Sequence, residues 1–239
     1  MEQANKERSL VSKVMDGLVA GIVEEKYGAV LPPQDVLSKE FDVSRTVMRE
    51  ALSMLLARDM LDVRPKIGTR IRAMRDWRMI DEDVVNWRFR SKPDPVFMRD
   101  VIEFRALIEP RASALAATRA SATDLAAIRD AFNAFRSLRP GEPGYQAADE
   151  LLHTRIVVAS GNQFFQQMAA IVRGALAAVN PIVVSRHETW ETIVAQHGRV
   201  VEAIERHDAG AAEAASLALI DFTVDEIGGA FTLERPVHG

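Results

Sequence analysis

The sequence contains no cysteine, which excludes disulfide cross-links and thiolate metal sites. It has no apolar run near the roughly 18 residues that a membrane-spanning helix needs. The first ten residues are polar and carry charges of both signs, unlike a secretory signal. These absences predict a cytoplasmic protein. At 239 residues, with 48% hydrophobic and 27% charged residues, the chain can form one large domain or two modest ones.

The chain also lacks an overall positive charge, since its formal net charge is −4. The charge is unevenly divided. Residues 1–75 hold 13 Lys and Arg against 11 Asp and Glu, whereas residues 76–239 hold 17 against 23. The first segment is therefore compatible with phosphate binding, but the protein as a whole is not a polycation that binds nucleic acid through bulk charge.

The N-terminal part of the chain shows apolar residues at helical spacing in three stretches. These predicted helices are Ser9–Lys26, Gln34–Phe41 and Arg45–Arg58. Val36, Leu37 and Phe41 are expected to face inward. Ser44 precedes the third helix and is a favourable N-cap residue. Because only a short turn separates the second and third helices, the pattern predicts a helix-turn-helix.

The periodicity changes after Asp59. Two alternating stretches, Leu61–Arg64 and Thr69–Arg72, flank a segment of turn residues from Pro65 to Gly68. This pattern predicts a β-hairpin, which would form the wing beside the helix-turn-helix. No strand pattern follows beyond residue 75.

The rest of the chain is predicted to be helical. Residues 76–92 form a connector with a short helix, anchored by Trp77, Ile80, Val84, Val85 and Trp87. Six longer helices are expected over Val96–Arg119, Thr123–Ser137, Tyr145–Ser160, Gln163–Asn180, Glu188–His207 and Ala209–Gly228. Ser121 or Thr123 would cap the second of these. Asn162 is expected to cap the fourth, the alternative being that it contacts a ligand. The sequence thus predicts a mainly α protein: a winged helix-turn-helix of three helices and a hairpin in residues 1–75, the connector, and an all-α antiparallel bundle in residues 93–230.

The start of the third helix carries the side chains expected to contact DNA. Arg45 and Arg49 are four residues apart and share one helix face, and arginine can read guanine through two hydrogen bonds. Ser44 and the helix N-terminus can hold a phosphate. The full predicted DNA-binding set is Ser44, Arg45, Thr46, Arg49, Lys66, Gly68, Thr69 and Arg70. The alternative is that these arginines only form a solvated helix face.

A second constellation lies in the helical part. Asp149 and His153 are four residues apart, so both lie on one face of one helix. His197 lies on a later helix among apolar residues at inward spacing. A carboxylate oxygen and imidazoles suit Zn, Ni or Mn, and bundles build such sites from facing helices. Alternatively, the histidines only form hydrogen bonds within a polar pocket. His187 and His207 lie near helix ends and are expected at the surface.

Arg105 lies within an otherwise apolar stretch, and a buried arginine needs a partner. A carboxylate that accepts two hydrogen bonds is the natural one. The partner is either the carboxylate of a ligand or an internal acid. The internal candidates are Glu103, Glu109 and Asp149.

The N-terminal motif resembles the GntR family of bacterial regulators. The resemblance rests on Leu31-Pro32, Leu37, the run Phe41-Asp42-Val43-Ser44-Arg45-Thr46-Val47-Met48-Arg49-Glu50-Ala51-Leu52, Leu55, and Lys66-Ile67-Gly68-Thr69. It implies a transcriptional regulator, not an enzyme, that binds a palindromic operator as a homodimer. Many members of the FadR branch carry an arginine that contacts DNA at the position of Asp35. That contact is absent here.

Residues 75–228 resemble the FCD effector-binding domain of the same branch. The matching motifs are Glu103-Phe104-Arg105-Ala106-Leu107-Ile108-Glu109-Pro110, Asp149 with His153, Ala159-Ser160-Gly161-Asn162, and His197 with Ala203-Ile204. The resemblance implies that Arg105 binds the carboxylate of an organic acid, and that Asp149, His153 and His197 bind metal and effector. The fourth metal ligand of the family falls at Leu219, which cannot ligate.

The connector from Trp77 to Trp87, together with Leu219, is similar to the galactonate-responsive branch. This implies a repressor that a sugar acid such as an aldonate releases from its operator. A regulator of another organic acid, a metal-dependent enzyme using Asp149, His153 and His197, and an architectural DNA protein remain as alternatives.

Overall fold

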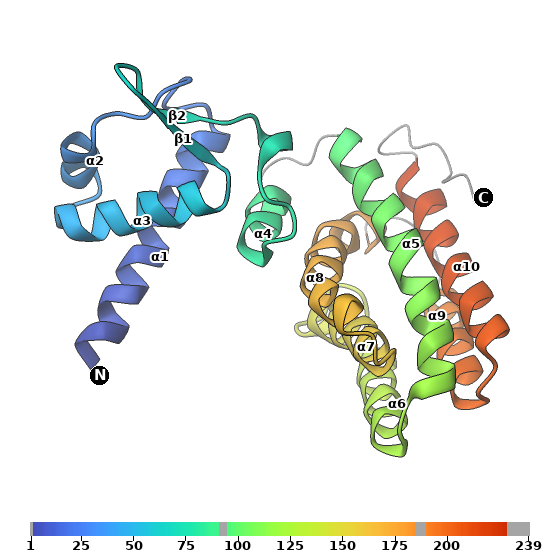
Figure 1. The fold of residues 1–239 in the computed structure, drawn as a ribbon. Coiled ribbons are helices and arrows are strands. Elements are labelled where there is room, and N and C mark those ends of the chain that lie inside the picture. The colour runs from blue at the N-terminus through green and yellow to red at the C-terminus, as the bar shows by residue number, and fades with distance from the viewer. Residues whose placement is uncertain (1, 91–94, 185–189, 229–239) are drawn as a thin grey trace. The chain divides into compact units, whose positions relative to one another are not determined.

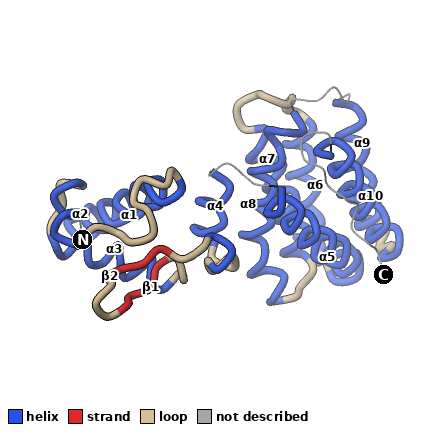
Figure 2. The backbone as a smooth tube through the Cα atoms, turned by 90° about the horizontal axis from the view of Figure 1, so that it is seen from above, coloured by secondary structure: helices blue, strands red, loops and turns tan. Residues whose placement is uncertain are grey.

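The computed structural model describes residues 2–90, 95–184 and 190–228 (Figure 1). The chain divides into two compact units, residues 1–92 and 93–239. Strands occur, within these described ranges, only in one hairpin of the first unit, and the second unit is built from helices (Figure 2). A search of the same residues for a helix with the length and hydropathy of a membrane span found none.

The first unit is a winged helix-turn-helix followed by a short helix. Its elements are α1 (Glu2–Val23), α2 (Gln34–Glu40), α3 (Arg45–Ala57), β1 (Leu61–Arg64), β2 (Gly68–Ile71), the 3-10 turn η1 (Met74–Asp76) and α4 (Glu82–Arg90). The two strands pair antiparallel, with Asp62 opposite Arg70. The backbone N–H of Leu31 donates to the carbonyl of Thr69 at 2.9 Å, which joins the segment before α2 to the hairpin. The predicted helix-turn-helix and wing are confirmed.

The third helix begins where its cap predicts. The Ser44 hydroxyl accepts a hydrogen bond from the backbone N–H of Val47 at 3.2 Å, which satisfies one of the free donors at the helix start. The inner face packs on α1 and α2 through Val47, Met48, Ala51 and Leu55. In α2, Leu37 is buried but Val36 is 47% exposed, so the prediction for Val36 is wrong. Consecutive residues lie about 100° apart around a helix, and this two-turn helix buries only a narrow stripe.

The connector helix α4 belongs to the core of the first unit. Trp77, Val84 and Trp87 are buried in the same apolar cluster as the inner faces of α1 and α3. Polar contacts add to this: the Trp87 indole N–H donates to Asp16 at 2.7 Å, and Arg58 pairs with Asp81 and Asp83. Ile80 is 69% exposed and does not anchor the connector, because it lies in the turn that precedes α4.

The second unit is an all-α bundle, as predicted. Its helices are α5 (Pro95–Arg119), α6 (Ala122–Arg136), α7 (Tyr145–Ala159), α8 (Gln163–Val184), α9 (Trp190–Glu205) and α10 (Ala209–Gly228). The long helix α5 packs along α10 and also contacts α7, α8 and α9, so it has neighbours on several sides (Figure 1). Ser121 caps α6 in a reciprocal capping box with Asp124. Asn162 accepts from the backbone N–H of Phe164 at 2.9 Å and caps α8.

Candidate DNA interface and candidate metal centre

The outer face of α3 presents the predicted recognition residues. Arg45, Thr46 and Arg49 are exposed, while the opposite side of the same helix is buried. Neither guanidinium forms an ion pair with any residue in the described part of the chain. Gln34 fixes the start of α3 by donating from its amide to the backbone carbonyl of Arg45 at 2.8 Å. The two arginine side chains therefore project from a rigid helix with their donors free.

The wing is more constrained than its sequence indicated. Lys66 is exposed in the turn with a positive φ of 66°, and Gly68 has a φ of 106°, where a glycine is favoured. Arg70, however, pairs with Asp62 across the hairpin at 2.8 Å, and Asp62 also contacts Arg64 at 3.1 Å. Thr69 is partly buried, and its carbonyl accepts from Leu31. Asp62, which no sequence motif singled out, thus already pairs with one of the cations predicted to contact DNA.

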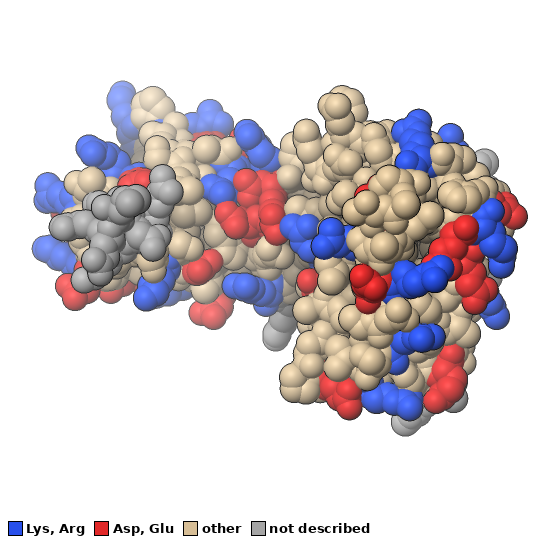
Figure 3. Space-filling view, turned by 90° about the horizontal axis from the view of Figure 1, so that it is seen from below, with Lys and Arg blue, Asp and Glu red and all other residues tan. Residues whose placement is uncertain are grey.

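The surface of the first unit carries both charges. On the face drawn in Figure 3, basic side chains line the outer edge of this unit, and acidic side chains are interspersed among them. This mixture agrees with the near balance of charge in residues 1–75. Phosphate binding would therefore depend on where individual cations lie rather than on total charge.

In the second unit, Arg105 is buried on the inner side of α5 and only 2% exposed. Its Nε donates to Oε1 of Glu109, one turn along the helix, at 2.5 Å. Of the three internal acids considered as partners, Glu109 forms the pair. Glu103 is exposed and lies 3.6 Å from Arg99. The predicted buried arginine therefore has an internal carboxylate partner in the free protein.

Glu109 also reaches the predicted metal site. Its second oxygen, Oε2, lies 2.6 Å from Nδ1 of His153 on α7. Burial by itself would raise the pKa of the Glu109 carboxyl, but the charges and hydrogen bonds of Arg105 and His153 lower it to about 2. Burial would lower the pKa of His153, but the charge and hydrogen bond of Glu109, together with Asp149, raise it. Glu109 is therefore an ionised carboxylate shared by a guanidinium and an imidazole.

The Nδ1 atom of His197 also has a hydrogen-bond partner. Its Nδ1 lies 2.8 Å from the carbonyl oxygen of Ile193, one turn earlier in α9. Since a carbonyl only accepts, Nδ1 carries the proton, and Nε2 of the neutral ring presents a lone pair. In the neutral form of His153 the carboxylate of Glu109 selects the same tautomer. Metal-binding histidines are commonly oriented by such hydrogen bonds to carboxylates and backbone carbonyls.

Three donor atoms meet at one point between α7 and α9. The distance between Nε2 of His197 and Oδ1 of Asp149 is 3.2 Å, between the two Nε2 atoms 3.4 Å, and between Nε2 of His153 and the same Oδ1 3.8 Å. Ligand atoms about 2.0–2.1 Å from one tetrahedral ion lie about 3.3 Å apart. Lone pairs that face one another repel unless a proton or a cation lies between them. The residues present therefore fit a metal ion, and the three predicted ligands do come together.

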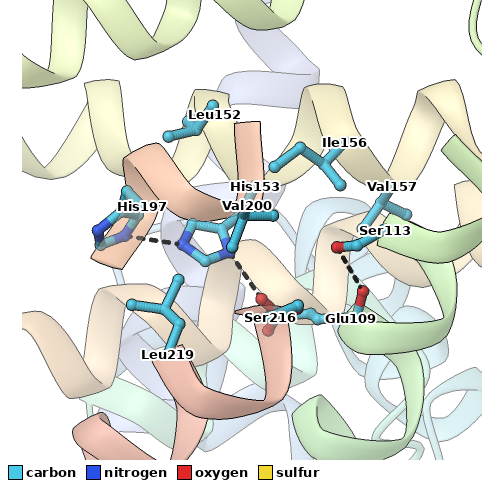
Figure 4. Close-up of a pocket in the computed structure, with 10 residues that line it drawn as sticks. All are labelled: Glu109, Ser113, Leu152, His153, Ile156, Val157, His197, Val200, Ser216 and Leu219. Atoms are coloured by element: carbon cyan, nitrogen blue, oxygen red, sulfur yellow. Dashed lines mark hydrogen bonds and ion pairs between the residues drawn. The ribbon is translucent and has the colours of Figure 1, made fainter. Parts of the chain in front are cut away.

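Two small cavities adjoin this cluster. One, of about 30 Å³, is lined by Arg105, Asp149, His153 and His197 together with Tyr145, Leu219 and Thr223. The other, of about 10 Å³, lies on the Glu109 side of His153 (Figure 4). Leu219 on α10 lines both cavities. The position at which the family resemblance places a fourth metal ligand is therefore at the centre of the site, and its side chain cannot ligate. Each cavity has room for only one or two waters.

Of the two histidines expected at the surface, only His207 lies in the described part of the chain. His207 is exposed near the end of α9, as expected, and its Nδ1 lies 2.9 Å from the carbonyl oxygen of Ala117. His187 falls outside the described residues. Asp35 is exposed at the start of α2.

A winged helix with free arginines on its third helix, joined to a helical unit with a buried polar site, defines a DNA-binding regulator with a sensor domain. Comparison with known families agrees. Residues 10–71 match the family described as "Bacterial regulatory proteins, gntR family", and residues 100–222, more than half of the chain, match the FCD domain. The chain therefore belongs to the GntR family of bacterial regulators and carries an FCD domain.

Individual relatives are similar along most of their length. The putative L-lactate dehydrogenase operon regulatory protein of Escherichia coli K12 is 30% identical over 229 residues, which cover 90% of this chain and 85% of the relative. The galactonate operon transcriptional repressor of the same strain is 29% identical over 208 residues, covering 83% and 88%. The structure of Lar from Listeria monocytogenes matches in fold, with a TM-score of 0.65 at 13% identity, over 90% of this chain and 95% of Lar.

These relatives are regulators of transcription. The protein is accordingly a transcriptional regulator and not an enzyme, so the alternative of a metal-dependent enzyme is excluded by the family.

Proposed function

We propose that the protein is a cytoplasmic repressor that binds a palindromic operator as a homodimer and is released by a small carboxylate. One observation carries the proposal: the buried guanidinium of Arg105 and the three donors Asp149, His153 and His197 line one cavity in the sensor unit. A site of this kind recognises an anion that also offers oxygen ligands to a metal.

For DNA binding we propose the exposed residues of the first unit. Arg45 and Arg49 would read bases in the major groove, because their donors are free and they share one helix face. Ser44 and Thr46, with Lys66, Gly68, Thr69 and Arg70 in the wing, would contact the phosphate backbone or the minor groove. In a two-fold dimer, two copies of α3 would meet successive major grooves, which requires a palindromic site.

For the sensor we propose that Asp149, His153 and His197 hold one divalent ion, Zn, Ni or Mn. One carboxylate oxygen and two imidazole nitrogens suit these metals. When bound, the ion supplies positive charge and an open coordination position for an oxygen of the effector. Glu109 and the Ile193 carbonyl hold the two imidazoles in the required orientation.

The charges of the buried cluster favour a monoanion. Arg105 is positive, Glu109 and Asp149 are negative, and the two histidines are neutral when they bind metal. A divalent ion therefore leaves the cluster with one net positive charge in a site that is almost fully buried. Uncompensated buried charge is strongly unfavourable. A single carboxylate neutralises it, whereas a dicarboxylate would overcompensate.

Among monocarboxylates we propose an aldonate. Its hydroxyl groups would bind the metal and the polar groups of the cavity, such as Tyr145 and Thr223. Burial and the nearby Asp149 raise the pKa of Tyr145, so its hydroxyl stays a hydrogen-bond donor. The names of two relatives refer to galactonate and to lactate dehydrogenase. A cavity of about 30 Å³ must widen for any such acid, and a ligand that favours a widened state shifts the protein toward it.

The proposal is tested by calorimetric titration of zinc-loaded protein with D-galactonate, D-gluconate, L-lactate and a fatty acyl-CoA. We expect one of the two aldonates to bind, and a dicarboxylate such as succinate to bind more weakly. Binding of only lactate or the acyl-CoA would contradict an aldonate sensor. DNA duplexes selected by the protein from a random pool then test release: the same aldonate should lower their affinity.

A further inference from the structure

Glu109 uses both carboxylate oxygens for two different partners. Oε1 accepts from Nε of Arg105 at 2.5 Å, and Oε2 accepts from His153 at 2.6 Å. Oε2 also lies 3.4 Å from Nη2 of Arg105. The residue is only 4% exposed. The carboxylate therefore lies between the guanidinium proposed to anchor the effector and an imidazole proposed to bind the metal.

We infer that Glu109 is an internal substitute for the effector's carboxylate, which must displace it from Arg105, and that it is at the same time the positioning residue for His153. The inference rests on the proposed function of this site. It concerns how the free protein compensates the positive charge of Arg105 and which acids can replace Glu109 as its partner.

The competition follows from the donors of the guanidinium. A carboxylate binds arginine most strongly across a pair of N–H groups, and Glu109 already faces the edge formed by Nε and Nη2. Arg105 also lines the larger cavity, on the same side as Asp149 and the two histidines. An acid entering that cavity therefore meets a guanidinium that already has a carboxylate partner.

Displacement exchanges one carboxylate for another at Arg105, so it yields little net binding energy. Glu109 keeps its hydrogen bond to His153, which limits the penalty of the exchange. An acid with only a carboxylate therefore binds weakly. A hydroxy acid gains further contacts to the metal and to the cavity walls, which make its binding net favourable. The internal carboxylate thus sets a threshold that selects for hydroxyl groups beside the carboxylate.

The test uses Glu109→Gln, which keeps the shape and removes the charge, with acetate and Zn²⁺ as probes. Acetate is the smallest carboxylate without a hydroxyl, and acetamide is its neutral analogue. We expect acetate to bind Glu109→Gln at least about tenfold more tightly than the wild type, because Arg105 has lost its counter-ion. Acetamide should show no such gain. Zn²⁺ should bind about tenfold or more weakly, because the orienting carboxylate of His153 is lost.

The matched control is Glu103→Gln, the same change on the same helix at an exposed position. It should leave both affinities at wild-type values. The double variant Arg105→Met with Glu109→Gln removes both charges, so the gain in acetate binding should disappear while the loss of Zn²⁺ affinity remains.

If Glu109→Gln does not fold alone, acetate but not acetamide should restore a cooperative unfolding transition. The inference is overturned if acetate neither binds the variant more tightly nor restores its folding, or if Zn²⁺ affinity is unchanged. If Glu109 had only a structural role, Glu109→Gln would bind both acetate and Zn²⁺ more weakly than the wild type. It would then show no preference for acetate over acetamide. Since no DNA and no aldonate are used, failure here is distinct from failure of the proposed repressor function.

Discussion

The two candidate sites both contain arginine, but these arginines differ in burial and in pairing. On α3, Arg45 and Arg49 are exposed and form no ion pair with described residues, so their guanidinium groups face water. On α5, Arg105 is buried and already paired with Glu109. An exposed arginine needs no protein partner because water solvates it, whereas a buried arginine needs an ion-pair partner in the free protein. In the proposed function, DNA therefore adds a partner to the exposed arginines, whereas the effector replaces Glu109 as the partner of the buried one.

Substitutions at either site test this comparison. The largest effect that we expect is loss of metal binding in Asp149→Asn. The substitution keeps the size of the side chain but removes the only negatively charged ligand of the proposed set. Loss of an outer hydrogen bond already weakens metal binding about 10–100-fold, so loss of this ligand should exceed about 100-fold. Competition with a chromogenic zinc indicator measures it. Glu150→Gln, the next residue on α7, is the control and should bind zinc as the wild type does.

Next in size is the loss of operator binding in Arg45→Ala and Arg49→Ala. Each removes a free guanidinium from the outer face of α3, and an arginine that reads a base contributes about 1–3 kcal/mol. Neither change should alter zinc binding or the melting temperature, because both side chains are exposed. Fluorescence anisotropy with a selected duplex checks this, with exposed Arg206→Ala in the sensor unit as control. Wild-type affinity in both variants would remove α3 from the interface.

A smaller, opposite effect is expected from Leu219→His. Leu219 lines both cavities beside the two histidines, so an imidazole there can complete a four-ligand site. We expect zinc to bind about tenfold or more tightly and the aldonate to bind more weakly, because the open position is filled. Leu217→His, on the same helix but lining neither cavity, should do neither. Unchanged zinc affinity in Leu219→His would place the metal elsewhere.

The smallest effect concerns the wing. Asp62 holds Arg70 and Arg64 at the protein surface, so Asp62→Asn frees both for phosphate contacts. We expect a few-fold gain in DNA affinity at low salt and a salt dependence steeper by up to about one unit per added contact. Titrations at several salt concentrations measure the slope, with exposed Asp130→Asn in the sensor unit as the control. An unchanged slope would show that neither arginine reaches DNA.

Much of the fold could be predicted from local sequence. Apolar periodicity located the described helices to within a few residues at most ends, and Ser44, Ser121 and Asn162 act as the caps they were expected to be. The failures have local causes. Val36 and Ile80 are apolar but exposed, one beside a narrow buried stripe and the other in a turn. Apolar character does not decide which side of a short element faces the core.

The buried site was predicted only in part. The spacing of Asp149 and His153 places both on one helix face, and that inference needs no tertiary information. For Arg105 the sequence analysis left three internal acids open, although Glu109, four residues later on the same helix face, could have been favoured by its spacing. The bond from Glu109 to His153 joins residues that are 44 positions apart, and no local pattern indicates such a contact. The pairing of Asp62 with Arg70, by contrast, follows from the hairpin register and could have been inferred.

The most direct test of regulation through the buried site is DNA release by an aldonate in two proteins. Zinc-loaded wild type and Asp149→Asn are bound to the same selected duplex and titrated with D-galactonate, with D-gluconate in parallel, while anisotropy follows the bound fraction. We predict that one of these acids dissociates the wild-type complex and leaves the Asp149→Asn complex intact, although both proteins bind the duplex equally well without it. Equal release of both proteins, or release of neither, would contradict control of DNA binding through this site.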